Sequence, residues 1–213
     1  ELSKIKTNGI GLYFGSFDPV HNAHIDIPLS VLEKYPLEKI IYIPSGKSPI
    51  GKKLFANKHY RYQMLLNATT FDDRLVVDDY EMNLNNAIFT YDSICYFKNK
   101  YSGMNLNLII GEDNFKSFES WYRYKDILNI ANLIVLARDN ADSCDNIKTL
   151  NKEREFTIEK LIKDMSHNIH IYNGYTNNIS STTVRELIRS NKPIDKYLDT
   201  KNIKLITENN LYK

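Results

Sequence analysis

Short apolar runs alternate with helical patterns along the whole chain, and this alternation limits the fold more than any other feature of the sequence. Repeated strand–helix units pack as a mainly parallel sheet with helices on both faces, because each parallel crossover needs a helix to return the chain. We therefore predict a doubly wound α/β fold. The predicted strands are Ile10–Phe14, Lys39–Pro44, Leu75–Asp78, Asn107–Ile110, Leu133–Ala137 and His170–Tyr172. The predicted helices are His21–Lys34, His59–Thr69, Tyr91–Lys100, Trp121–Ile130, Leu150–Asp164, Thr182–Ser190 and Thr200–Asn209.

The length and the hydrophobic content favour a single folding unit. A chain of 213 residues, of which 42% are hydrophobic, can bury one substantial core. We expect one domain over residues 1–213, which ends in a small helical part from about residue 181. Two segments without periodicity, Ser45–Asn57 and Asp139–Lys148, are predicted to be loops. Pro28 lies within the first predicted helix and predicts a bend there, because proline lacks a backbone donor.

The charge balance and the lengths of the apolar runs argue against several classes of partner. The formal net charge is +2, from 28 basic and 26 acidic residues, so the chain lacks the strongly basic character of nucleic-acid-binding proteins. No apolar run approaches the roughly 18 residues that span a bilayer, and the first residues do not resemble a secretory signal. We expect no nucleic acid, no membrane and a cytoplasmic location, with the nucleus left open for a eukaryotic host. Cys95 and Cys144 show no metal-ligand spacing, so we predict two reduced thiols and no metal site.

The segment from Gly15 to His24 follows the first predicted strand directly and combines a glycine turn with the start of a helix. In an open parallel sheet, a turn at the carboxyl end of a strand is a typical ligand site. Gly15 would let the backbone approach a phosphate closely, and the helix start offers unpaired N–H groups to an anion. His21 and His24, three positions apart, share a face of the helix and can both reach phosphate oxygens.

Two other interpretations of this histidine pair stay open. The rings can be solvated or structural, as two histidines near a helix start often are. They can also bind zinc, since His167 and His170 repeat the spacing later in the chain. Alternation along the strand at His170 argues against zinc, because it would point these rings in different directions.

A second polar segment, which ends at Arg185, places hydroxyl groups at a predicted helix start and a guanidinium one turn later. Ser181, Thr182 and Arg185 lie within about one turn of each other and can close on a single polyphosphate. An ordinary N-cap is the alternative, because Thr183 and Glu186 fit the pattern of a capping box. The presence of both segments in one chain favours a nucleotide site and an enzyme that acts on ATP.

The first segment resembles the (H/T)xGH signature of the nucleotidylyltransferase superfamily, and residues 179–185 resemble its ISSTxxR partner. Nearly the whole chain is similar to nicotinate and nicotinamide mononucleotide adenylyltransferases, and above all to the bacterial-type nicotinate enzyme. The resemblance implies a Rossmann-like fold and adenylyl transfer from ATP to nicotinate mononucleotide, which gives deamido-NAD and pyrophosphate in NAD biosynthesis. Further matching segments are Ile43–Pro44, His59–Leu65, Phe89–Tyr91, Ile109–Asp113, Trp121–Tyr122, Asn132–Arg138 and Glu208–Tyr212.

The resemblance also implies how the reaction would be catalysed. The attacking phosphate oxygen is already anionic near neutral pH, so positioning and charge neutralisation would take the place of a general base, with Mg²⁺ carried by the ATP phosphates. His21, His24 and Arg185 would be the catalytic residues. The residues that would bind ATP are Gly15, Ser16 and Phe17 in the first turn, Gly111 and Asp113 at the ribose, and Ser181 and Thr182 at the β- and γ-phosphates.

For the second substrate, the similarity places the pyridine ring against Trp121 and its carboxylate near Thr90 and Tyr122. Lys47 and Lys52 lie in the loop that would meet the phosphate of the mononucleotide. On the sequence alone, Trp121 is equally well explained as a core aromatic residue, and each lysine as a solvated one. The expectation of a homodimer rests on the family likeness alone.

Three departures from the family pattern affect the expected substrates. Ala23 replaces the second signature glycine and adds a methyl group near the adenosine, which would weaken ATP binding. Phe14 stands where bacterial relatives usually have glycine, and Ser48–Lys53 lacks an expected histidine. The sequence of that last segment is more similar to eukaryotic relatives, many of which accept both mononucleotides. Preference for nicotinamide mononucleotide, or for both substrates, therefore stays open, as do phosphopantetheine or cytidylyl transfer and a non-catalytic nucleotide-binding module.

Overall fold

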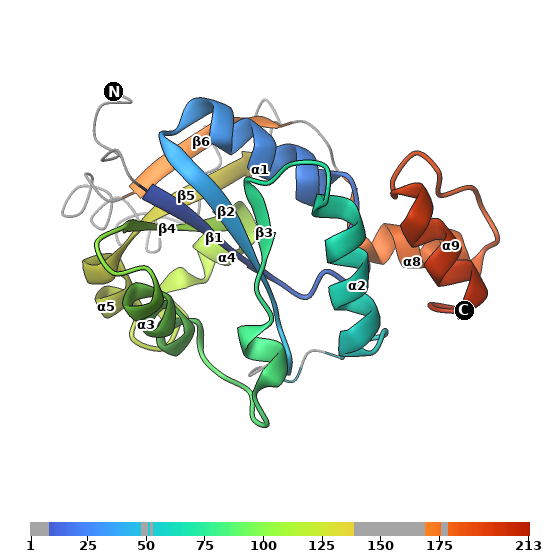
Figure 1. Ribbon diagram of the computed structural model, residues 1–213, viewed down its shortest axis with the longest axis horizontal. Coiled ribbons are helices and arrows are strands. Elements are labelled where there is room, and N and C mark those ends of the chain that lie inside the picture. Colours follow the sequence, from blue (N-terminus) through green and yellow to red (C-terminus); the bar gives the residue numbers. More distant parts are fainter. Residues whose placement is uncertain (1–8, 48–50, 52, 139–168, 176–178) are drawn as a thin grey trace.

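The computed structural model describes residues 9–47, 51, 53–138, 169–175 and 179–213 (Figure 1). Several predictions fall outside these described residues. They are the helix over Leu150–Asp164, the loop over Asp139–Lys148, the candidate phosphate ligand Lys52, and the single residues Cys144 and His167.

Six parallel strands form one sheet in the order β3-β2-β1-β4-β5-β6. This is the strand order of the Rossmann fold, and it confirms the predicted doubly wound α/β architecture. Central strands of such a sheet are covered on both faces, which is why they read as continuous apolar runs. The strands are β1 (Gly9–Gly15), β2 (Leu37–Pro44), β3 (Leu75–Val77), β4 (Asn105–Gly111), β5 (Ala131–Arg138) and β6 (Ile169–Tyr175).

Helices cover both faces of the sheet and bury two apolar clusters against it (Figure 1). One face carries α1 (Ala23–Lys34) and α2 (Lys58–Thr69), and the other carries α3 (Thr90–Lys100), α4 (Glu112–Lys116) and α5 (Tyr124–Ile130). The side chains of β1 alternate between the two faces, because successive residues of a strand point in opposite directions. Ile10 and Leu12 enter the cluster under α3 and α5, and Tyr13 packs against the cluster under α1 and α2.

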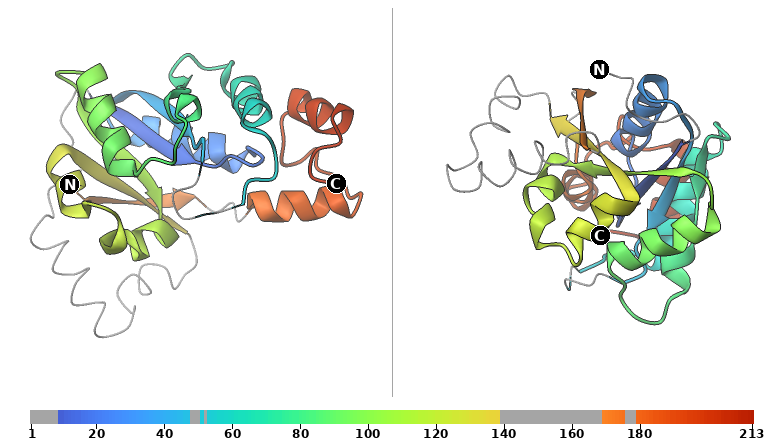
Figure 2. Two further views of the ribbon diagram at one scale, coloured as in Figure 1. Left: turned by 90° about the horizontal axis from the view of Figure 1, so that it is seen from below. Right: turned by 90° about the vertical axis from the view of Figure 1, so that its left-hand side faces the viewer.

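Helices α8 (Ser181–Arg189) and α9 (Thr200–Glu208) lie at one end of the molecule, away from α3 and α5 (Figure 2). α9 docks on α2 through buried polar contacts, since Asn202 Nδ2 donates to the carbonyl oxygen of Met64 at 2.9 Å and Asn67 Nδ2 donates to Asn202 Oδ1 at 3.0 Å. This docking holds α9 against α2. Within the described residues, no helix combines the length and the apolar character needed to cross a bilayer.

Some boundaries differ from the sequence predictions. α5 begins at Tyr124 instead of Trp121, because a 3₁₀ turn, η3 (Phe118–Ser120), and a left-handed Arg123 precede it. Neither α4 nor the 3₁₀ helix η2 (Tyr80–Asn83) was predicted, since elements of four or five residues show no readable period. α1 runs from Ala23 to Lys34 with Pro28 inside it, and a bend at Pro28 stays a prediction.

Candidate active site

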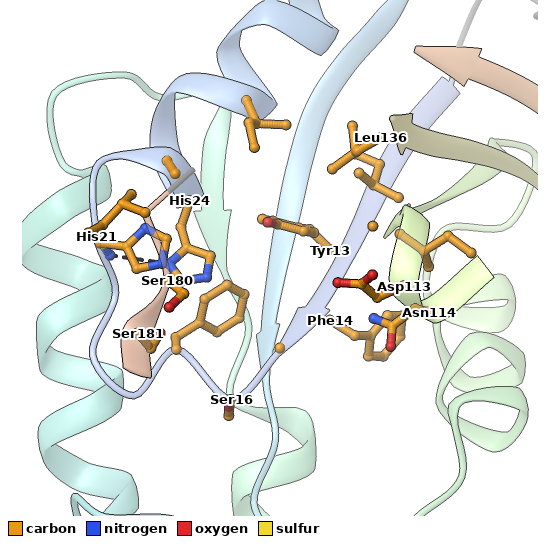
Figure 3. A pocket seen from close by; sticks show the side chains of 18 of the residues that line it. Tyr13, Phe14, Ser16, His21, His24, Asp113, Asn114, Leu136, Ser180 and Ser181 are labelled. Atoms are coloured by element: carbon orange, nitrogen blue, oxygen red, sulfur yellow. Dashed lines mark hydrogen bonds between the residues drawn. The ribbon is translucent and has the colours of Figure 1, made fainter. Parts of the chain in front are cut away.

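A cleft of about 430 Å³ opens at the carboxyl ends of β1 and β4, next to the start of α8 (Figure 3). At this point the chain leaves β1 toward one side of the sheet and β4 toward the other, which is where open α/β sheets bind ligands. The two polar segments meet here although more than half the chain separates them. The cleft is lined by every residue expected to be catalytic or to hold ATP, namely Gly15, Ser16, Phe17, His21, His24, Gly111, Asp113, Ser181, Thr182 and Arg185.

The turn after β1 is shaped by the ring of Phe17. Phe17 has a left-handed backbone (φ 47°), which is uncommon for a bulky residue, and its ring folds back over Gly15. A Cβ on Gly15 would lie 2.9 Å from that ring, so a larger residue would have to displace it. Phe17 is buried and packs edge-on against His24, with ring centroids 5.1 Å apart. The turn therefore holds the imidazole of His24 at the wall of the cleft.

The orientation of His24 is fixed by two hydrogen bonds. The backbone N–H of His21 donates to His24 Nδ1 at 3.1 Å. A ring nitrogen that accepts a hydrogen bond carries no proton, so the proton of His24 is on Nε2, which makes Nε2 a donor. Pro28 offers no N–H to the carbonyl oxygen of His24 one turn earlier in α1. The hydroxyl of Tyr42 on β2 donates to that oxygen instead, at 2.8 Å.

His21 lies beside His24, and the two rings stack with centroids 3.7 Å apart (Figure 3). His21 is only 6% exposed, and burial lowers the pKa of its imidazole to about 4. Its Nδ1 atom is buried and has no hydrogen-bond partner among the described residues. His21 is therefore neutral at physiological pH and can donate from only one ring nitrogen.

The start of α8 contacts the first segment directly. Ser181 Oγ donates to the carbonyl oxygen of Pro19 at 2.9 Å. Arg185 donates from one terminal nitrogen to the carbonyl oxygen of Asp18 at 2.7 Å and from the other to Thr182 Oγ1 at 3.0 Å. The N-cap of α8 is Ser180, whose Oγ accepts a hydrogen bond from the backbone N–H of Thr183. The alternative capping box with Thr183 as N-cap and Glu186 as its partner therefore does not form.

Two buried charged residues, which the sequence reasoning did not single out, brace the loops around the cleft. Asp18 accepts hydrogen bonds from the backbone N–H groups of Phe55 and Ala56 at 2.6 and 3.0 Å. Arg61 on α2 donates to the carbonyl oxygens of Ser16 and Ser45, at 2.8 and 2.7 Å. Burial lowers the pKa of the Arg61 guanidinium, and the nearby charge of Asp18 opposes this shift. The loops after β1 and β2 are therefore tied to each other through α2.

The side of the cleft near β4 carries Gly111 and Asp113, the residues expected to contact the ribose, and two departures from the family pattern lie elsewhere in its lining. A Cβ on Gly111 would meet no atom within 4 Å, so the space in front of this residue is open to a ligand. Asp113 follows it at the start of α4. Ala23 and Phe14 both line the cleft, and the ring of Phe14 packs edge-on against Phe97 at 6.4 Å between centroids.

The residues expected to bind the mononucleotide do not line this cleft. Thr90 begins α3, and Trp121 packs beside Phe118 with ring centroids 5.3 Å apart. Tyr122 is 49% exposed and packs against Phe89, the residue before Thr90, with the two rings tilted and their centroids 4.8 Å apart. Thr90 and Tyr122 are thus neighbours at the face of the sheet that carries α3 and α5. Lys47 donates to the carbonyl oxygen of Asn85 at 2.8 Å.

Comparisons with known proteins agree on one family. A family model described as "Cytidylyltransferase-like" matches residues 12–187. A Clostridium botulinum protein named "Probable nicotinate-nucleotide adenylyltransferase" is 34% identical over 200 residues, which cover 93% of this chain and 96% of that protein. A Clostridium beijerinckii protein of the same name is 30% identical over 209 residues, which cover 95% and 98%. The solved structure of Plasmodium falciparum nicotinic acid mononucleotide adenylyltransferase complexed with NaAD superposes with a TM-score of 0.75 at 20% identity, over 96% of this chain and 97% of that one.

Proposed function

The chain belongs to the cytidylyltransferase-like family and, within it, to the nicotinate-nucleotide adenylyltransferases, and on this premise we propose that it transfers the adenylyl group of ATP to nicotinate mononucleotide. The products would be deamido-NAD and pyrophosphate, in NAD biosynthesis. The observation that carries this proposal is the cleft in which His21, His24 and Arg185 converge from the two ends of the sequence.

The reaction is a displacement at phosphorus. A phosphate oxygen of the mononucleotide forms a bond to the α-phosphorus of ATP, and the bond from that phosphorus to the oxygen bridging to the β-phosphorus breaks. The nucleophile is anionic near neutral pH, so the protein need not remove a proton. Its work is to align the two substrates and to neutralise the charge that develops on the phosphates.

The histidines would act as hydrogen-bond donors to ATP. His24 would donate from Nε2 to an oxygen of the transferred phosphate, because its Nδ1 is already occupied by the backbone N–H of His21. His21, held neutral by burial, would support the same phosphates from the neighbouring position. A neutral donor of fixed orientation loses little energy to reorganisation when charge develops in the transition state.

The start of α8 would hold the leaving pyrophosphate. Ser181, Thr182 and Arg185 face the cleft on the side opposite β4 and would bind the β- and γ-phosphates. Mg²⁺ enters as part of the substrate MgATP. Phosphate oxygens and water would be its main ligands, because Mg²⁺ keeps several waters and takes few ligands from a protein.

The mononucleotide would bind across the carboxyl ends of β1 and β4, toward the face that carries α3 and α5. Its pyridine ring would lie near Trp121, with the carboxylate toward Thr90 and Tyr122, and Lys47 would attract its phosphate. This arrangement is supported by the proximity of Thr90 and Tyr122, through Phe89. A homodimer is a further part of the proposal, and sedimentation measurements would test it.

A coupled assay that offers MgATP with either mononucleotide tests the proposed function. We expect dinucleotide formation with a higher kcat/KM for nicotinate mononucleotide, and a loss of about 100-fold or more in kcat for His24→Ala, since a positioned donor at a phosphoryl transition state contributes that much. His59→Ala, an exposed histidine on α2, should leave kcat unchanged. Equal kcat/KM values would show dual specificity. If no dinucleotide forms with either mononucleotide, the proposal is wrong, and cytidylyl and phosphopantetheine transfer should be tested next.

A further inference from the structure

The carboxyl group of Asp18 is the centre of a buried hydrogen-bond network beside the cleft. Asp18 is 2% exposed. Its Oδ2 accepts from the N–H of Phe55 at 2.6 Å, and its Oδ1 accepts from the N–H of Ala56 at 3.0 Å and from the hydroxyl of Tyr212 at 2.8 Å. Tyr212 lies 194 positions away in the sequence, so this contact joins the first signature segment to the last residues described.

The same residue holds Arg185 through its main chain. The carbonyl oxygen of Asp18 accepts from Arg185 at 2.7 Å, and the next carbonyl, that of Pro19, accepts from Ser181 at 2.9 Å. A rotation of Asp18 would therefore displace both anchors of α8. Because buried hydrogen bonds restrain such a rotation, the groups that hold the Asp18 carboxyl also determine where Arg185 lies.

Tyr212 is well placed to be one of these groups. It is 7% exposed and packs in the apolar cluster under α1 and α2. Burial and the neighbouring charge of Asp18 raise the pKa of its hydroxyl far above the usual range, so the hydroxyl stays protonated as a donor. A charge-assisted hydrogen bond of this kind is stronger than a neutral one.

We propose that Tyr212 is a positioning residue for adenylyl transfer, which acts through the Asp18 carboxyl to hold Arg185 at the phosphate cleft. This inference rests on the proposed function for its kinetic consequences. Tyr212 is far from the signature segments in the sequence, so no sequence pattern indicates this role. Tyr212 itself need not touch a substrate.

Tyr212→Phe removes only the hydroxyl and is the central test. We expect the Kd of MgATP, measured by calorimetry, to rise about fivefold and kcat to fall about tenfold, because a small displacement of a phosphate-binding group is costly. The KM for the mononucleotide should stay within about twofold. A merely structural loss would lower the fraction of active protein, and hence kcat, but would leave the Kd of MgATP unchanged; that result would overturn the proposal.

Tyr60→Phe is a matched control, because the hydroxyl of Tyr60 donates to Asn209 Oδ1 at 2.9 Å. It removes a hydrogen bond of similar length to the same end of the chain without touching Asp18, so its Kd for MgATP should equal that of the parent. An equal effect of the two variants would refute a specific role for Tyr212. If the parent protein makes no dinucleotide, the proposed function is wrong. The ratio of the Kd of MgATP for Tyr212→Phe to that for the parent still tests the role of Tyr212.

A double-mutant cycle with Arg185→Lys tests whether Tyr212 affects MgATP binding through Arg185. The lysine cannot reproduce the fork that contacts both the Asp18 carbonyl and Thr182. In this background we expect Tyr212→Phe to change the Kd of MgATP by less than about twofold, because residues that act through one contact are not additive. Multiplicative losses would show that Tyr212 does not act through Arg185.

Discussion

At the residue scale, the two histidines of the signature segment differ in their surroundings although both line the cleft. His24 has its Nδ1 occupied by a backbone donor, which leaves its proton on Nε2. His21 is buried, with the pKa of its imidazole lowered to about 4. A buried neutral ring next to an oriented one provides two donors without a positive charge, so most of the positive charge at the phosphates must come from Arg185 and the magnesium ion.

Ala23 is the substitution in the signature whose effect can be measured most directly. It is the first residue of α1, is buried and lines the cleft. We expect Ala23→Gly to lower the KM for ATP about two- to fivefold, by removing a methyl group from the wall of the cleft. Steady-state kinetics with ATP as the varied substrate measures this change.

The same substitution should lower the free energy of unfolding by about 0.5–1 kcal/mol, because glycine weakens a helix relative to alanine. Ala68→Gly on α2, also buried but not lining the cleft, should reduce stability and leave the KM for ATP unchanged. An unchanged or higher KM in Ala23→Gly would show that the methyl group does not restrict ATP.

The sequence predicted several of the residues that line the cleft, since His21, His24 and Arg185 lie in two short patterns with recognisable chemistry. It did not identify Asp18, Arg61 or Tyr42 as supports. Their roles depend on partners such as Ala56, Ser45 and the carbonyl of His24, which no pattern in the neighbouring sequence specifies. The support of a site is a property of the tertiary contacts, whereas its ligands follow from local motifs.

At the scale of elements, α1 and β2 are joined by a hydrogen bond that a proline makes possible. Pro28 leaves the carbonyl oxygen of His24 without its helical partner, and Tyr42 donates to it. We expect Tyr42→Phe to lower the free energy of unfolding by about 1–3 kcal/mol, because a buried carbonyl is left unsatisfied. Urea unfolding measures this loss. Tyr35→Phe, a buried tyrosine without a hydroxyl hydrogen bond in the described structure, should cost much less.

Pro28→Ala should rescue the stability of the Tyr42→Phe variant. The new N–H of residue 28 can donate to the carbonyl oxygen of His24, so the double variant with Tyr42→Phe should regain most of the lost stability. Additive losses in the double variant would show that the hydroxyl of Tyr42 acts elsewhere.

Helices and strands could be predicted where their apolar residues follow a regular pattern that is long enough to recognise. The six apolar runs became the six strands, because buried parallel strands are apolar on both faces. α4, which carries Asp113, has five residues and therefore no measurable period. The residues predicted as the first turn of α5, Trp121–Arg123, are not helical: they follow the 3₁₀ helix η3 and end in a left-handed Arg123, which propensity alone does not indicate.

At the scale of the whole molecule, two buried titratable groups make stability depend on pH in opposite directions. The unfolded His21 binds a proton below its ordinary pKa of 6.5, whereas the folded form does so only below about 4. Stability is therefore lost as the pH falls through this window. Glu81 is 7% exposed, accepts from Ser93 Oγ at 2.6 Å, and has its pKa raised by burial from 4.5 to about 7.

Glu81 consequently favours folding below pH 4.5, and this contribution is lost as the pH rises through about 7, because the unfolded carboxyl ionises first. Glu81→Gln keeps the acceptor for Ser93 without the charge. We expect the variant to match the parent near pH 4.5 and to be more stable by about 2–3 kcal/mol at pH 8, as measured by urea unfolding across that range. Glu38→Gln, at an exposed position near the start of β2, is the matched control for removing a carboxylate. Parallel stability curves for Glu81→Gln and the parent would mean that the Glu81 carboxyl is already ionised in the folded protein near neutral pH.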